Sequence, residues 1–465
     1  MFCRFVDIHA MLAGRIDLLL ALIDHAGLGA QSFVCWYFLC HGILHFLIHQ
    51  PAGAGLRSAI GPRDRHCGTT LRRLCFFGHE TVSFTPLPRV VPVTCPIPPD
   101  GQGRAHGHKG CLDATARRAL FLAAASEDCG ASHIKASILV LASAGLLDWD
   151  MRGPDALFGH LIAIGEVNLP AARLFEGHVN ALRLIRAYAD PSLQADVRRD
   201  VKDGLLLGVW GADGHRPLEI VGPGLTGGKK FASGLGVVGK AIVTVGQGSD
   251  LRLALLDVSD TARHIHASWR KTGMRATVSG DFDATDLPSA ALQWVGAPGQ
   301  YFNEPLFIGG VWRIAAVQAG GALGLLRAAA DNLASLGRLT HEAQVARLAP
   351  VLTRALAAAE FTRQAAICAE GPQGLLDPDC AASLSAQARL LTEDVGQDVI
   401  AAVERSIGLS HFDVDAVTGR IARDLATYMR QAARDAFLQR AGSWALGQNV
   451  AFSTLLGGGG SDARM

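Results

Sequence analysis

The sequence predicts an α+β protein in which helices come first, a β-rich segment follows and longer helices end the chain. Three observations lead to this prediction. From about residue 111, apolar residues recur at three- and four-residue intervals, the spacing of amphipathic helices. Short runs rich in Val, Ile, Leu and Thr, separated by Gly, Pro and Asp, fill residues 206–297. Helical spacing returns after Pro298 and continues to about residue 445. This order of elements is typical of an α+β architecture.

Each part of the pattern predicts its own elements. Asn168 can cap a helix that has Pro170 in its first turn. The β-rich segment predicts an antiparallel unit of six or more strands. Four helices are expected after it, over residues 306–336, 342–369, 381–407 and 417–441. The expected domains are 111–205 (helical), 206–297 (β) and 298–445 (helical bundle), with a flexible Gly-rich tail at 446–465.

The first 110 residues differ in composition from the rest of the chain. They hold 6 of the 10 Cys, 9 of the 17 His and 8 of the 19 Pro, but only 6 acidic residues. Because residues 50–110 also lack a helix or strand period, we expect a disordered or mis-assigned extension. Two alternatives stay open. Residues 30–49 are about as long as a membrane helix, roughly 20 residues, and His41, His45 and His49 share a helix face that could hold a metal ion.

The overall composition excludes several classes of protein. With 49% hydrophobic and 18% charged residues, the chain is neither disordered nor fibrous. Its 43 basic and 42 acidic residues nearly cancel, so no nucleic-acid partner is expected. Cysteines are sparse in the organised region, as Cys368 and Cys380 illustrate. This favours a reducing compartment, and we expect a cytoplasmic protein.

Familiar catalytic motifs are scarce. Gly234–Gly239 reads GLGVVG and matches GxGxxG, but a dinucleotide site needs a helix after the turn, whereas a strand-like run follows. A Gly-rich hairpin is the better interpretation. His264 and His266 alternate on one strand face, but two His residues without a third ligand do not predict a metal site.

Several segments, taken in order, carry a family resemblance. Residues 269–282 (WRKTGMRATVSGDF) and 225–234 (LTGGKKFASG) resemble two segments of the middle β-domain of acyl-CoA dehydrogenases, and Ile421–Leu425 resembles their C-terminal RDA turn. Over about residues 112–445 the chain is thus similar to flavoproteins of the acyl-CoA dehydrogenase superfamily. The resemblance implies an N-terminal helical domain, a barrel-like antiparallel β-domain and a C-terminal four-helix bundle. It also implies bound FAD and a homodimer or homotetramer.

The resemblance also implies site residues. Val209, Trp210, Phe231 and Ser233 are expected to line the isoalloxazine ring, with the Ser233 hydroxyl near flavin N5. The Trp-containing strand at Gly208–Gly211 resembles the related flavin-dependent monooxygenase branch. Gln344 matches the family's glutamine that contacts the cofactor across the dimer.

Three departures from the family concern catalysis and cofactor binding. Ala432 stands where the usual catalytic Glu is found, and Trp312 stands at the alternative position of that base. Leu333 replaces the Arg that contacts the cofactor phosphate. Glu304, at the head of the first C-terminal helix, is the candidate substitute base. Asp424 is a second candidate, but for this residue we expect a structural role in holding helices together.

The activity expected from the resemblance is an FAD-dependent oxidation, either α,β-dehydrogenation of an acyl thioester or a related flavin reaction on a small molecule. A flavin-dependent monooxygenase and a non-catalytic flavin-binding homologue are the alternatives. The monooxygenase needs no carboxylate base to remove a substrate proton.

Overall fold

Five helices open the part of the chain that the computed structural model describes, which comprises residues 112–150, 153–430 and 433–456. The Asn168 side chain accepts the Ala171 N–H at 3.1 Å, and Pro170 occupies the first turn of the helix that begins at Leu169. The predicted start of that helix is confirmed. The five helices are α3 (Ala114–Asp128), α4 (Lys135–Ser143), α5 (Pro154–Val167), α6 (Leu169–Tyr188) and α7 (Pro191–Lys202).

Nine strands follow in the described residues, in three small sheets. The strands are β1 (Leu207–Trp210), β2 (Glu219–Val221), β3 (Gly224–Thr226), β4 (Gly228–Ala232), β5 (Lys240–Val245), β6 (Arg252–Asp257), β7 (His264–Ile265), β8 (Gly280–Asp283) and β9 (Gln293–Val295). The sheet orders are β1-β5-β6-β9, β4-β8-β7 and β2-β3.

Two parts of the β-domain prediction are wrong. None of the sheets described closes into a barrel, because β1 and β9 are the outer strands of the largest sheet and do not pair with each other. The unit is also not wholly antiparallel, since β1 pairs with β5 in parallel register. The parallel pair arises because the chain leaves the first sheet after β1, forms β2, β3 and β4 elsewhere, and then returns.

The GLGVVG segment connects β4 to β5. The strand β5 follows it directly, so it lacks the helix that a dinucleotide fingerprint requires. The hairpin interpretation is wrong as well, because β4 pairs with β8 whereas β5 pairs with β1 and β6. The segment therefore crosses from one sheet to another. Gly234 and Gly236 have φ angles of +83° and +78°, which glycine adopts at little cost.

The C-terminal helices depart from the expected four. The first begins at Trp312 rather than near residue 306, after a short 3₁₀ turn, η7 (Gly309–Val311). The last expected helix is divided in two, and Ala433, with φ of +60°, lies at the break. The helices are α8 (Trp312–Ser335), α9 (Glu342–Glu370), α10 (Pro372–Leu376), α11 (Pro378–Ile407), α12 (Val417–Tyr428) and α13 (Arg434–Leu446).

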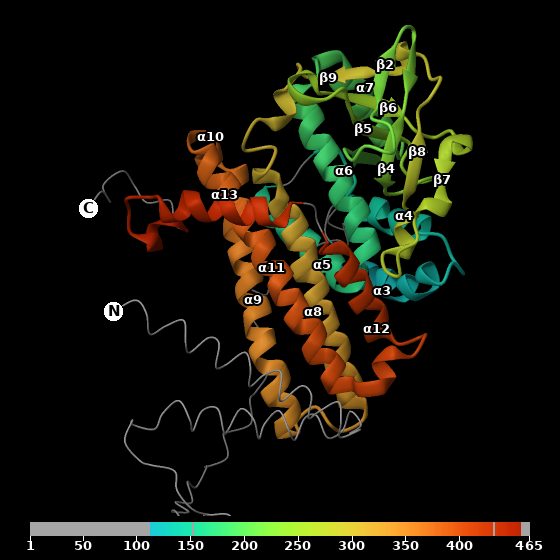
Figure 1. Cartoon of the computed structure of the whole chain (residues 1–465). Helices are drawn as coiled ribbons and strands as arrows, with labels where there is room; N and C mark the ends of the chain where they lie inside the picture. The colour runs from blue at the N-terminus through green and yellow to red at the C-terminus, as the bar shows by residue number, and fades with distance from the viewer. Residues whose placement is uncertain (1–111, 151–152, 431–432, 457–465) are drawn as a thin grey trace, which may run out of the picture. The chain divides into compact units, whose positions relative to one another are not determined.

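Helix α8 lies between the N-terminal and C-terminal helices. On one side its backbone touches α5: a Cβ atom on Gly320 would come within 2.5 Å of the Ile162 carbonyl oxygen, and one on Gly324 within 2.2 Å of the Glu166 carbonyl oxygen. On the other side α8 packs against α9 and α11, and the three run side by side in Figure 1. Glycine at these positions therefore allows the close approach of α5 and α8.

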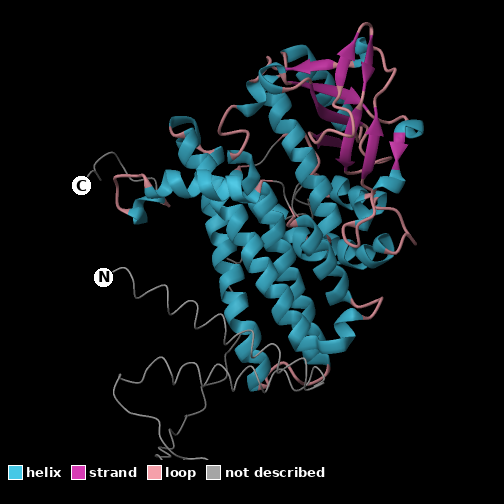
Figure 2. Ribbon diagram, viewed as in Figure 1, coloured by secondary structure: helices cyan, strands magenta, loops and turns pink. Residues whose placement is uncertain are grey.

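Helix α6 links the sheets to the helical bundle. In its second half, Leu182 and Ile185 join α7 in covering the four-stranded sheet, where they pack with Leu207, Ile242 and Leu253. In Figure 2 the strands gather around this end of α6. Its first half contacts α8 and α12 instead. Side chains near the start of α6 are thus placed between the β-domain and the C-terminal helices.

The expectations for residues 1–110 lie outside the described residues. This holds for the disordered extension, for the membrane-helix alternative at residues 30–49 and for the metal-binding face of His41, His45 and His49. None of the helices described is long and apolar enough to cross a bilayer.

Candidate functional site

A cavity of about 590 Å³ lies where α6, β4, the loop before β8 and α12 meet. Its volume is within the range of small-molecule sites, roughly 300–1,000 Å³. Three kinds of side chain dominate its lining: three aromatic rings, five aliphatic hydroxyls and four basic groups. These residues are Phe231, Trp269 and Tyr428; Ser233, Thr272, Thr277, Ser279 and Thr427; and Arg173, Lys271, Arg423 and Arg430.

Phe231 reaches the cavity because β4 contains a bulge. Lys229 pairs with Phe282 and Ala232 with Gly280, so the register against β8 shifts between them. Phe231 lies within this bulge with φ of +57°, and its side chain is 52% exposed. Bulges redirect side chains out of a strand ladder. An exposed aromatic ring in a left-handed backbone conformation is a costly arrangement, of the kind found at ligand sites.

The Ser233 hydroxyl belongs to a chain of three hydroxyls. The Ser279 hydroxyl donates to Ser233 Oγ at 3.1 Å, and Thr277 Oγ1 lies 2.7 Å from Ser279 Oγ. Because Ser233 accepts a proton here, its own proton can be donated to a group in the cavity. Trp210 of β1 supports Ser233 from behind, since its indole N–H donates to the Ser233 carbonyl at 3.1 Å.

Lys229 fixes the base of this strand. Its side chain is fully buried, and its ammonium group donates to Asp213 at 2.5 Å and to Thr244 at 2.6 Å. Burial lowers the pKa of Lys229, and Asp213 partly opposes that shift. The lysine thereby ties β4 to β5 and holds the bulge that carries Phe231.

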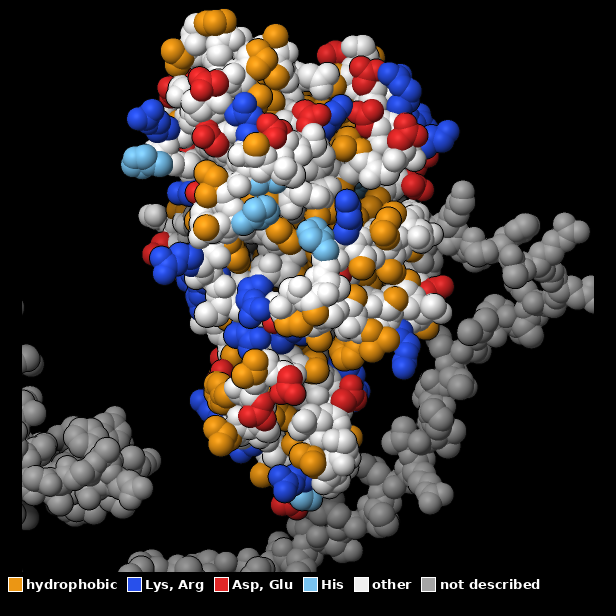
Figure 3. All heavy atoms as spheres, turned by 90° about the vertical axis from the view of Figure 1, so that its right-hand side faces the viewer, with side chains coloured by type: hydrophobic (Ala, Val, Ile, Leu, Met, Phe, Trp, Pro, Cys, Tyr) orange, Lys and Arg blue, Asp and Glu red, His pale blue; other side chains and the backbone are white. Residues whose placement is uncertain are grey.

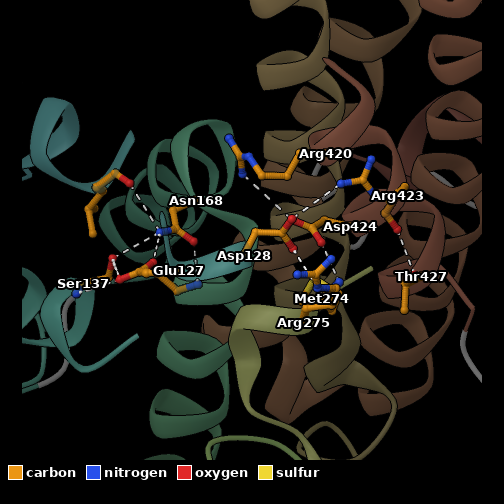
Figure 4. Close-up of polar contacts among 12 residues, drawn as sticks. Glu127, Asp128, Ser137, Asn168, Met274, Arg275, Arg420, Arg423, Asp424 and Thr427 are labelled. Atoms are coloured by element: carbon orange, nitrogen blue, oxygen red, sulfur yellow. Dashed lines mark hydrogen bonds and ion pairs between the residues drawn. The ribbon is translucent and has the colours of Figure 1, made fainter. Parts of the chain in front are cut away.

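The loop before β8 is clamped to α12. Asp424 accepts the Met274 N–H at 2.5 Å, and Figure 4 shows Asp128 between Arg423 and Arg275, at 3.5 and 3.7 Å. Burial raises the pKa of Asp424 to about 6, although the Met274 bond opposes the shift. The carboxylate of Asp424 therefore joins the loop before β8 to α12.

A buried network holds Arg173 at the cavity wall. Arg173 donates to Glu176 at 2.6 Å, Glu176 also accepts from Asn180, and Asn180 accepts from Arg313 of α8. Arg313 in turn pairs with Glu370 of α9. Three helices thus fix the orientation of Arg173. Burial alone would lower the pKa of Arg173, but the Glu176 carboxylate raises it above the ordinary value.

Tyr428 lies beside the Arg173–Glu176 pair. Burial, reinforced by Glu176, raises the pKa of the Tyr428 phenol well above its ordinary value. The phenol is therefore neutral at physiological pH.

On the face shown in Figure 3, which carries β7 and α12, Lys and Arg side chains gather near the middle.

The structure places the expected site residues in different surroundings. Phe231 and Ser233 line one cavity, with Trp210 directly behind Ser233. Val209 is half-buried and packs with the core between α6, α7 and the largest sheet. Gln344 lies in the first turn of α9, where its amide donates to the Ser406 carbonyl at 3.3 Å.

Glu304 lies away from the cavity lining. Its carboxylate accepts the N–H groups of Ile308 and Gly309 at 2.9 and 3.0 Å, and Arg440 lies 3.3 Å away. Burial raises its pKa, against the opposing effect of these bonds. The carboxylate caps the η7 turn that leads into α8.

Trp312, Leu333 and Ala432 stand where the family has its catalytic base or its phosphate-binding arginine. Trp312 is buried and donates its indole N–H to Glu370 at 3.1 Å, and Leu333 is buried in α8. Ala432 lies outside the described residues. None of the described residues that line the cavity is Asp or Glu.

Several residues of the cavity were missed at the level of sequence. Arg173, Trp269, Lys271 and Arg430 line it, but only Trp269 and Lys271 fall within the 269–282 segment that resembles the family's middle β-domain. Arg173 and Arg430 lie in helical runs, where arginine is usually taken for a solvated residue.

Comparisons with known proteins identify the fold. No family model and no curated protein matches the sequence. Among solved structures, dibenzothiophene monooxygenase TdsC from Paenibacillus sp. A11-2 superposes with a TM-score of 0.61 at 17% identity, covering 71% of this chain and 95% of that one. TdsC has also been solved with FMN and indole.

Two further structures agree with TdsC. Methanesulfinate monooxygenase MsuC from Pseudomonas fluorescens has a TM-score of 0.58 at 18% identity, over 74% of this chain and 100% of that one. A nitrososynthase from Micromonospora carbonacea var. africana has a TM-score of 0.60 at 17% identity, over 72% and 95%. The chain therefore has the fold of acyl-CoA dehydrogenase-like flavoproteins, and the resemblance seen in the sequence is confirmed at the level of fold.

Proposed function

We propose that the chain is a flavin-dependent oxidoreductase that holds the flavin in the 590 Å³ cavity and acts as a monooxygenase. The observation that carries this proposal is the lining: the exposed Phe231 ring and the Ser233 hydroxyl line the cavity, and no described lining residue is a carboxylate. The fold and the cavity volume are compatible with such a cofactor.

The residues present fit a flavin. The Phe231 ring offers a flat surface on which an isoalloxazine ring can stack. Ser233 can donate a hydrogen bond to a ring nitrogen or oxygen, and the basic residues can pair with a phosphate. FAD is expected from the resemblance. However, Leu333 offers no phosphate contact, and TdsC holds FMN, so FMN is a competing candidate.

The lack of a carboxylate among the described lining residues favours oxygenation over dehydrogenation. A bound flavin would supply the redox chemistry, by accepting a hydride or, once reduced, by reacting with oxygen. Dehydrogenation of an acyl thioester also needs a base that removes the α-proton. The carboxylate of Glu304 is occupied by two backbone N–H groups and lies outside the lining. Monooxygenation requires no such carboxylate, and TdsC and MsuC, which share the fold, are monooxygenases.

A flavin titration tests where the cofactor binds. The full-length protein is titrated separately with FMN and FAD, and the quenching of flavin fluorescence is followed. Phe231→Ala should weaken flavin binding by about tenfold, since stacking and burial of an aromatic ring contribute on the order of 1–2 kcal/mol. Phe412→Ala is the matched control, because Phe412 is an exposed ring outside the cavity. If both variants bind flavin as tightly as the wild type, the flavin does not bind in this cavity.

The reaction type is tested with the flavin-loaded protein. Oxygen uptake that depends on an added NADH–flavin reductase and on an organic substrate supports monooxygenation. Anaerobic bleaching of the flavin by an acyl-CoA would instead support dehydrogenation, and Glu304→Gln should then abolish the bleaching if Glu304 is the base. Tight flavin binding with neither activity would indicate a non-catalytic homologue.

A further inference from the structure

The loop before β8 contains a turn whose backbone is conformationally costly. This 3₁₀ turn, η4 (Arg275–Thr277), is flanked by Met274 and Val278, whose φ angles are +54° and +47°. Left-handed backbone is unfavourable for any residue with a Cβ atom, and a β-branched residue such as Val278 adopts it rarely. Such a turn persists only where the surrounding structure holds it. Its shape therefore depends on the contacts on its two sides.

On one side, the turn is bonded to the segment that carries Ser233. The carbonyls of Thr277 and Val278 accept the next two backbone N–H groups after Ser233, at 2.8 and 3.1 Å. The Ser279 hydroxyl donates to Ser233 Oγ at 3.1 Å. Because these bonds fix both the backbone that follows Ser233 and its hydroxyl, the place of Ser233 in the cavity wall depends on the turn.

A hydrogen-bonded path crosses the turn to α12. Thr277 Oγ1 donates to the Met274 carbonyl at 2.6 Å and lies 2.7 Å from Ser279 Oγ. On the opposite side of the same residue, the Met274 N–H donates to Asp424 at 2.5 Å (Figure 4). The path therefore runs from Asp424 through Met274, Thr277 and Ser279 to the Ser233 hydroxyl.

On the other side, the loop lies directly on α12. A Cβ atom on Gly273 would come within 2.0 Å of the Arg423 carbonyl oxygen, so the backbones of loop and helix are in contact. Asp424 is 1% exposed, and its Oδ2 atom is buried without a hydrogen-bond partner. The nearest base, Arg420, lies 4.0 Å away. The bond to the Met274 N–H is thus the contact through which the Asp424 side chain acts on the loop.

We propose that Asp424 is a positioning residue: through the Met274 amide it holds the left-handed turn, and the turn sets the Ser233 hydroxyl for its contact with the flavin. The role toward the flavin rests on the proposed function. Asp424 does not line the cavity, so it acts only through the turn. Its charge is not required, because an uncharged oxygen accepts the same N–H bond.

A double-mutant cycle tests whether Asp424 acts through Ser233. The full-length protein is titrated with whichever of FMN and FAD the wild type binds more tightly, and quenching of flavin fluorescence is followed. Asp424→Ala and Ser233→Ala should each weaken binding by about fivefold, the loss of roughly one neutral hydrogen bond. The double variant should be no weaker than Ser233→Ala. Independent effects would instead multiply to about 25-fold and would overturn the inference.

Three further variants separate the hydrogen bond from the charge and from folding. Asp424→Asn keeps an acceptor oxygen and should bind flavin like the wild type. Arg420→Leu is the matched control, since it removes the same ion pair but leaves the Met274 bond, so flavin affinity should not change. If Asp424→Ala does not fold because Arg420 is left unpaired, the combined variant Arg420→Leu, Asp424→Ala replaces it in the cycle.

Trypsin gives a readout that needs no flavin. Lys271 and Arg275 are exposed cleavage points in the loop, and both should be cut faster in Asp424→Ala than in the wild type or in Asp424→Asn. Equal cleavage rates would show that Asp424 does not hold the turn. Faster cleavage with unchanged flavin affinity would show that the turn does not position Ser233, which also overturns the inference.

Failure of the proposed function would look different. In that case no flavin binds even to the wild type, and the role of Asp424 toward the flavin is wrong as well. The cleavage rates would still decide whether Asp424 holds the turn. If flavin binds to the wild type and only the cycle is additive, the proposed function stands and the positioning role fails.

Discussion

His178 is held by two hydrogen bonds that require its neutral form. Its Nδ1 accepts the Leu207 N–H at 3.0 Å, which leaves the proton on Nε2 to donate to the Leu147 carbonyl at 2.9 Å. The ring is fully buried. Burial lowers the pKa of His178 from 6.5 to about 4, although the bond to Leu147 opposes the shift. The residue connects α6 to the start of β1 and to the loop after α4.

This arrangement predicts a loss of stability in mild acid. Below pH 6.5 the unfolded chain binds a proton at His178 that the folded protein excludes, so the contribution present above pH 6.5 is lost as the pH falls towards 4. The shift from 6.5 to about 4 corresponds to about 3 kcal/mol of unfolding free energy. Urea unfolding of the wild type and of His178→Gln at pH 7.5, 5.5 and 4.5 measures it. The variant should be less stable at pH 7.5 but should lose less stability on acidification. Parallel pH profiles would show that His178 does not cause the loss.

Two residues of the candidate cavity could be predicted from sequence, because a local motif contains them. Phe231 and Ser233 lie in a recognisable strand segment, and both line the cavity. The burial of Arg389 could not be identified, because it depends on how α11 packs against the other helices. Arg173 likewise depends on partners in α8 and α9, more than 130 residues away in sequence. Contacts between residues so far apart produce no periodic pattern in the sequence.

At the scale of elements, local sequence signals predicted where helices begin better than they predicted which strands pair with each other. Asn168 and Pro170 mark the start of α6 because capping involves only neighbouring residues. The break between α12 and α13 was missed, since neither Gly nor Pro marks it and Ala433 adopts the left-handed conformation instead. The parallel pairing of β1 with β5 was missed because strand period does not reveal which strands become neighbours.

The contact between α5 and α8 predicts opposite effects for two glycine substitutions. In Gly324→Ala the new Cβ would lie 2.2 Å from the Glu166 carbonyl oxygen, so the helices must separate, at a cost of about 1–3 kcal/mol or more. In Gly159→Ala, an exposed position of α5 with no atom within 4 Å, the gain in helix propensity should stabilise the protein by about 0.5–1 kcal/mol. Chemical denaturation measures both. A neutral Gly324→Ala would show that α5 and α8 are not in backbone contact.

At the scale of the whole molecule, α9 carries an apolar stripe that the described chain does not cover. Val345, Leu352, Leu356 and Ile367 are each more than a third exposed, at 49%, 42%, 54% and 38%. Their spacings of 7, 4 and 11 residues place them on one face of the helix. A row of large exposed apolar side chains commonly marks a protein–protein interface. The family resemblance implies a homodimer or homotetramer, and we expect the stripe to be its contact surface.

The stripe predicts an oligomer that charge can dissociate. The full-length protein should sediment as a dimer or tetramer, and the double variant Leu352→Glu, Leu356→Glu should sediment as a smaller species, because two carboxylates would be buried without partners in the interface. Leu122→Glu, Leu139→Glu is the matched control, since these side chains on α3 and α4 are 61% and 63% exposed but lie outside the stripe. Circular dichroism checks that both variants keep their helices. If the wild type is a monomer, the stripe is not an interface. If only the control variant dissociates, the interface lies elsewhere.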